Sequence, residues 1–78
     1  MTNNEANAAI ARFKDMLKAQ NGYQIRDTAR PLYGAMLEAD VPQDSARWVF
    51  DNLLAAIEAG NDDLAMHHFR YAVLMAQN

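Results

Sequence analysis

The chain has 78 residues, no cysteine, and seven lysine and arginine residues against ten aspartate and glutamate residues, which gives a formal net charge of −3. This length predicts one domain, residues 1–78. The lack of cysteine excludes disulfides, thiolate nucleophiles and thiolate metal sites. The charge balance argues against direct binding of nucleic acid, because such binding depends on neutralising phosphates with lysine and arginine.

The start of the chain predicts neither export nor membrane insertion. Residues 1–5 contain no basic segment followed by an apolar one, so they do not resemble a signal peptide. No apolar run in the sequence approaches the roughly 20 residues that a helix needs to span a bilayer. We therefore expect a cytoplasmic protein that does not contact a membrane.

The first helix is predicted over residues 3–20. Thr2 and Glu5 have the spacing of a capping box, in which a hydroxyl and a carboxylate three residues later cap each other's backbone amides. Apolar side chains then recur at helical spacing on one face. We expect Gly22 to take the left-handed conformation that follows the end of such a helix.

A second helix is predicted over residues 24–39, with two interpretations of its start. Pro31 lies inside the apolar pattern. Either the helix begins near Thr28 as its N-cap, with Pro31 in the first turn, or it begins near Tyr23 and kinks. Gly34 lowers helix stability in the middle of this segment, and we interpret it as a site of close helix packing.

The third and fourth helices are predicted over residues 42–59 and 62–76. Pro42 suits the first helical position, and Gly60 is predicted to end the third helix. Asn61 is predicted to cap the fourth helix. Four helices with short connections indicate an all-α fold, a small four-helix bundle of short antiparallel helices.

Gly60, Ala65, Phe69 and Ala72 place a glycine, a small, an aromatic and a small residue at helical intervals. With these residues, the stretch 58–73 resembles the second helix of a tetratricopeptide repeat and the turn before it. The resemblance covers about 15 of 78 residues and does not extend to the first helix of that repeat. It implies that the third and fourth helices form an antiparallel pair.

The sequence contains no catalytic, metal or nucleotide motif. His67 and His68 are the only histidines, and neighbouring residues of a helix point about 100° apart, so the pair is unsuited to hold one metal ion. Asp63 and His67 predict an exposed ion pair, and His68 falls at the edge of the core. Ser45 lacks the glycines of a nucleophile elbow. We expect no enzyme activity, no cofactor and no metal.

Trp48 is the main candidate for contact with a partner, because tryptophan is enriched at binding hot spots. It lies opposite the predicted inward face of the third helix. A third helix buried on both faces would cover Trp48 instead, and the sequence favours neither alternative. An apolar strip on the fourth helix also lies off the predicted core. The predicted partner-binding residues are Trp48, Asp51, Ala55, His67, Tyr71 and Leu74.

These features predict a non-enzymatic protein–protein interaction module. The leading hypothesis is a small acidic inhibitor or regulator, of the type that phages and mobile elements encode, which docks on a larger protein such as one that handles nucleic acid. The first alternative is a homodimeric structural helix bundle. The second is a DNA-binding regulator with residues 39–42 as the turn of a helix-turn-helix. Its recognition helix would begin with Gln43 and Asp44, which carry no positive charge to bind phosphates.

Overall fold

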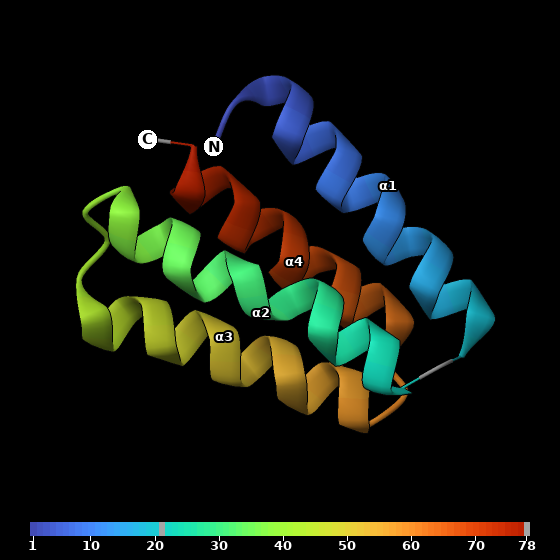
Figure 1. Ribbon diagram of the computed structural model, residues 1–78. Coiled ribbons are helices and arrows are strands. Elements are labelled where there is room, and N and C mark those ends of the chain that lie inside the picture. Colours follow the sequence, from blue (N-terminus) through green and yellow to red (C-terminus); the bar gives the residue numbers. More distant parts are fainter. Residues whose placement is uncertain (21, 78) are drawn as a thin grey trace.

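Four amphipathic segments form helices in the computed structural model, which describes residues 1–20 and 22–77. The helices are α1 (Asn3–Ala19), α2 (Gly22–Glu38), α3 (Gln43–Glu58) and α4 (Asp62–Ala76). No strand occurs within the described residues, and each helix lies within two residues of its predicted bounds. The predicted all-α four-helix bundle is therefore confirmed (Figure 1).

Helices α2, α3 and α4 pack on one another, and α1 lies across α2 and α4 without reaching α3 in the described part of the chain. Short turns join α3 to α2 and to α4, so α3 is antiparallel to both (Figure 1). This arrangement confirms the antiparallel pair implied by the local resemblance. The two ends of the chain also meet, because the Met1 ammonium donates a hydrogen bond to the carbonyl of Ala76 at 3.3 Å.

The core consists mostly of short side chains around one aromatic stack. Within the described residues the buried apolar side chains are Ala6, Phe13, Leu17, Ile25, Ala29, Leu32, Met36, Ala46, Val49, Leu53, Ala56, Ala65, Phe69, Ala72, Val73 and Ala76. Many of these are alanines, whose small side chains let neighbouring helices approach closely. The fully buried rings of Phe13 on α1 and Phe69 on α4 stack with centroids 4.0 Å apart, which fastens α1 to the other helices.

The capping box at the start of α1 is confirmed. The backbone amide of Thr2 donates to Glu5 Oε1 at 2.9 Å, and the amide of Glu5 donates to Thr2 Oγ1 at 3.2 Å. The bond from the Thr2 amide to Oε1 favours the ionised carboxylate, so it lowers the pKa of Glu5. The prediction for the other end of α1 is wrong. Gln20 takes the left-handed conformation there, with φ of 54°, and Gly22 already belongs to α2.

The interpretation of Thr28 as an N-cap is also wrong, because α2 begins at Gly22 and continues through Pro31. The hydroxyl of Thr28 instead donates to the carbonyl of Gln24, one turn earlier, at 2.7 Å. This is the bond that threonine makes inside a helix rather than at its start. Pro31 removes one backbone donor from the interior of α2, a cost that the packing of α2 against its three neighbours offsets.

Gly34 is not a site of close helix packing, contrary to the prediction. A Cβ atom added at this position would meet nothing within 4 Å, and the residue is exposed. Its effect is therefore the conformational freedom that glycine adds to the unfolded chain, without compensation from packing.

We expect Gly34→Ala to raise the free energy of unfolding by about 1 kcal/mol, the difference between alanine and glycine in a helix interior. Gly60→Ala is a matched control, because a Cβ at Gly60 also meets nothing within 4 Å but φ there is +71°. The free energy of unfolding of that variant is expected to fall by about 1 kcal/mol, since an L-residue is strained in this conformation. Urea denaturation followed by circular dichroism measures both, and equal shifts would contradict the explanation.

Helices α2 and α3 end with the same hydrogen-bonded turn. After α3, the amide of Gly60 donates to the carbonyl of Ile57 and the amide of Asn61 donates to that of Ala56, each at 3.1 Å. This pattern is a Schellman motif, and Gly60 ends the helix as predicted. After α2 the equivalent left-handed position is held by Asp40, with φ of 64°. Asp40 thus carries a Cβ atom and a negative charge where glycine is preferred.

Asp40→Gly is expected to stabilise the protein by about 1 kcal/mol, because it removes left-handed strain and a carboxylate from the negative end of α2. Asp40→Asn removes only the charge, so about half of this gain is expected from it. Thermal and urea unfolding of both variants separate the two contributions. A glycine variant no more stable than the asparagine variant would show that the strain is negligible.

Candidate partner-binding surface

Exposed apolar side chains gather on one side of α3 and α4. Among the described residues, the large apolar side chains that remain exposed are Met1, Leu37, Trp48, Leu64, Tyr71 and Leu74. Four of these six belong to α3 and α4. Single exposed apolar residues are ordinary, whereas a group of them marks a contact surface. We call the surface formed by Trp48, Ala55, Leu64, His67, Tyr71 and Leu74 the α3–α4 face.

Helix α4 has two apolar sides because two sets of residues recur along it at helical spacing. Its buried side carries Ala65, Phe69, Ala72, Val73 and Ala76. Its outer side carries a row of Leu64, His67, Tyr71 and Leu74, spaced by three, four and three residues. That spacing is the one by which a helix presents a continuous seam to another helix. The inner row fixes α4 in the bundle, and every member of the outer row is exposed.

Trp48 is 65% exposed, which decides between the two alternatives for this residue. Helix α3 buries Ala46, Val49 and Leu53, and Trp48 does not share their side of the helix. The alternative of an α3 covered on both faces required another helix over Trp48. No described helix provides that cover, because α1 packs on α2 and α4 and does not contact α3.

A shallow groove of about 330 Å³ lies between α3 and α4 at this face. We call it the α3–α4 groove, and its lining residues are Asp44, Ser45, Trp48, Val49, Tyr71 and Met75. Trp48 and Tyr71 thus share one depression, with exposed fractions of 65% and 49%. The side-chain Nδ2 of Asn52 donates a hydrogen bond to the backbone carbonyl of Trp48 at 2.8 Å. An apolar side chain of a partner could enter between the two aromatic rings.

The predicted partner-binding residues fall into two groups. The first group is the five residues assigned to the α3–α4 face, which are all exposed, and two of them, Trp48 and Tyr71, share the α3–α4 groove; the five are Trp48, Ala55, His67, Tyr71 and Leu74. Asp51 is exposed as well, but it lines a separate groove between α2 and α3.

Leu64 is 43% exposed and was missed by the sequence reasoning. Its position three residues before His67 and seven before Tyr71 would have identified it. The lining of the α3–α4 groove by Met75 was missed too, because that contact depends on how α4 sits against α3.

The two histidines are neighbours on α4 and differ in exposure. His67 is exposed and His68 half-buried, as predicted, and their rings meet edge to face with centroids 5.7 Å apart. The predicted ion pair of Asp63 with His67 is not formed, since the ion pairs of the described residues are Arg26–Glu58 and Arg30–Asp27. The described part of the chain contains no group of three or more side chains that could together hold a metal ion.

Carboxylates outnumber arginines on helices α3 and α4. Helix α3 carries Asp44, Asp51 and Glu58 and helix α4 carries Asp62 and Asp63, against Arg47 and Arg70. No described helix is both long and apolar enough to cross a membrane. No protein-family model, curated protein or solved structure matches the chain.

Proposed function

We propose that the protein is a non-enzymatic interaction module that docks on a larger protein through the α3–α4 face. The observation that carries the proposal is the gathering of Trp48, Leu64, Tyr71 and Leu74 on that face, with exposed fractions between 43% and 65%. Binding energy in protein interfaces concentrates in a few central side chains, and tryptophan and tyrosine are the most enriched of these. We assign Trp48 and Tyr71, which line one groove, to such a centre.

Charge favours a partner whose own surface is basic. Residues 41–78 hold Arg47 and Arg70 against Asp44, Asp51, Glu58, Asp62 and Asp63, so the whole net charge of −3 lies in this half. A complementary positive surface would accelerate encounter and fix orientation. Proteins that handle nucleic acid carry surfaces of this kind, and a docked acidic module would cover one. The proposed mode of action is therefore inhibition or regulation by occupying a basic surface.

A homodimeric helix bundle is the second candidate, because the outer row of α4 has the spacing of a helix–helix seam. The same charge distribution weighs against it. Two copies meeting through the α3–α4 face would bring together two halves that each carry a net charge of −3. Light scattering over a concentration series distinguishes the candidates, since a stable dimer at micromolar concentration would favour the structural bundle.

The DNA-binding alternative has less support. The exposed residues of α3 include Asp44, Asp51 and Glu58 but only Arg47 as a cation. A recognition helix with this composition would repel phosphates rather than contact them. Cytoplasmic location remains part of the proposal, in keeping with a chain that has no cysteine.

The experiment is capture from a cell extract followed by reconstitution with the purified partner. The chain is immobilised as wild type, as the double variant Trp48→Ala/Tyr71→Ala, and as the control Leu37→Ala, which removes an exposed apolar side chain away from the face. Docking through the α3–α4 face requires that wild type and control retain the same protein and that the double variant loses it. Retention by all three would refute the proposed face.

A further inference from the structure

A second groove, on the other side of α3, has a chemical character unlike that of the α3–α4 face. We call it the α2–α3 groove; it has a volume of about 390 Å³ and is lined by Arg30, Tyr33, Arg47, Phe50 and Asp51. This volume lies in the range of small-molecule sites. It combines two guanidinium groups, two aromatic rings and one carboxylate, and the proposed docking surface uses none of them.

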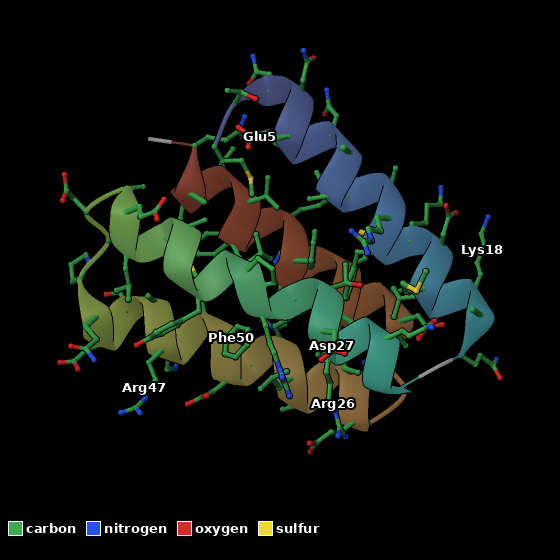
Figure 2. All side chains as sticks on the ribbon, in the orientation of Figure 1. Glu5, Lys18, Arg26, Asp27, Arg47 and Phe50 are labelled. Carbon is green, nitrogen blue, oxygen red and sulfur yellow. The ribbon has the colours of Figure 1, made fainter. Side chains whose placement is uncertain are left out.

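The groove is built from the same short pattern on both helices. Arg30 precedes Tyr33 on α2 by three residues, and Arg47 precedes Phe50 on α3 by three residues. A spacing of three places both members of each pair on one side of their helix. Because α2 and α3 are antiparallel, the two pairs run in opposite directions, and all four side chains line the same groove. Figure 2 shows the Phe50 ring between α2 and α3 and the Arg47 side chain extending outward from α3.

The two rings form a half-buried aromatic surface. Tyr33 and Phe50 contact each other with centroids 5.8 Å apart and planes at 54°. Both side chains are partly exposed, so a part of each ring remains accessible from the groove. An exposed aromatic surface of this kind accepts a flat ring by stacking, as in proteins that bind nucleobases.

The guanidinium groups beside these rings are available to a ligand. Arg47 makes no ion pair with any described residue, and Arg30 makes one long contact of 3.5 Å with the exposed Asp27. Neither guanidinium takes part in the aromatic contacts of the described residues. Arginine binds phosphate in a bidentate, charge-assisted manner, which two exposed guanidinium groups on opposite walls could provide together.

We propose that the α2–α3 groove binds a nucleoside monophosphate. The ring pair of Tyr33 and Phe50 receives the base, Arg30 and Arg47 hold the phosphate, and the Asp51 carboxylate accepts hydrogen bonds from hydroxyl or amino groups of the ligand. A single phosphate suits the groove better than a nucleic-acid strand, because Asp44, Asp51 and Glu58 along α3 would repel the neighbouring phosphates of a polymer. The site is separate from the α3–α4 face and independent of the proposed docking function.

The test is a titration of the whole ¹⁵N-labelled chain with adenosine monophosphate, followed by NMR. Amide shifts are expected at Arg30, Tyr33, Arg47 and Phe50, and Arg47→Gln is expected to weaken binding about tenfold. Arg70→Gln is the matched control, since it makes the same charge change on α4 outside the groove. Trp48→Ala is expected to leave the titration unchanged, which separates this site from docking.

Further ligands decide what the groove recognises. Adenosine and inorganic phosphate are each expected to bind at least tenfold more weakly than the monophosphate, because each lacks one of the two recognised groups. Phe50→Leu keeps apolar volume but loses the ring, so it should weaken the monophosphate and not inorganic phosphate. Three outcomes would each overturn the proposal: no amide shifts on addition of the monophosphate, a loss of affinity in Arg70→Gln equal to that in Arg47→Gln, or tighter binding of an oligoadenylate than of the monophosphate.

Discussion

Replacing Phe13 by alanine is expected to lower the free energy of unfolding by about 3–5 kcal/mol, the loss typical of a deleted core phenylalanine. Phe13 is fully buried and stacks on Phe69 with ring planes 11° apart. A domain of this size has only a few kcal/mol of net stability, so most of the Phe13→Ala chains should be unfolded or lack a docked α1. Circular dichroism and urea denaturation report the loss of helix.

Phe13→Leu serves as the matched variant, because it keeps most of the apolar volume and removes the aromatic stack. A smaller loss of about 1–2 kcal/mol is expected, which leaves a folded chain whose unfolding can be measured. Since α1 contacts only α2 and α4 in the described chain, hydrogen exchange should show the extra opening concentrated in α1. A Phe13→Leu variant as stable as wild type would contradict the role of the stack.

The second large effect is expected in binding. With the purified partner, Trp48→Ala and Tyr71→Ala should each raise Kd about 30-fold or more, the level that defines a hot spot. The free energy of unfolding of both variants should stay within about 0.5 kcal/mol of wild type, because neither side chain belongs to the buried core. Calorimetry measures the affinity and urea denaturation the stability.

Two controls make that result specific. Leu37→Ala, away from the face, should leave Kd unchanged. The double variant Trp48→Ala/Tyr71→Ala should lose less binding free energy than the two single variants lose in sum, because the two side chains line the same groove and act together. Loss of affinity in Leu37→Ala, or none in either aromatic variant, would place the interface elsewhere on the bundle.

Local signals predicted most of the fold. The capping box of Thr2 and Glu5, the end of the third helix at Gly60 and the Asn61 cap each depend on a few neighbouring residues, and all three occur as expected. The predictions about Gly22 and Thr28 failed because tertiary packing supports a helix that begins at Gly22 and continues through Pro31, so both residues belong to α2. The prediction about Gly34 failed because this position of α2 is exposed and a Cβ atom there would meet nothing within 4 Å.

The candidate surfaces were predictable in part. Helical periodicity identified Trp48, Tyr71 and Leu74 as off-core residues, and all three are exposed. Whether another helix covered them depended on the placement of α1, which no local pattern encodes. The α2–α3 groove depended on the pairing of two helices, although the repeated arginine–aromatic spacing at Arg30 and Arg47 was visible in the sequence.

The most direct test of the docking surface is the environment of Trp48 in the isolated chain, since it is the only tryptophan. Its emission and its quenching by acrylamide would be recorded while light scattering reports the mass over a concentration series. We predict a single chain with red-shifted, readily quenched emission, as expected for an exposed indole free to meet a partner. A single chain with blue-shifted, protected emission would place Trp48 in the core and contradict the proposed face.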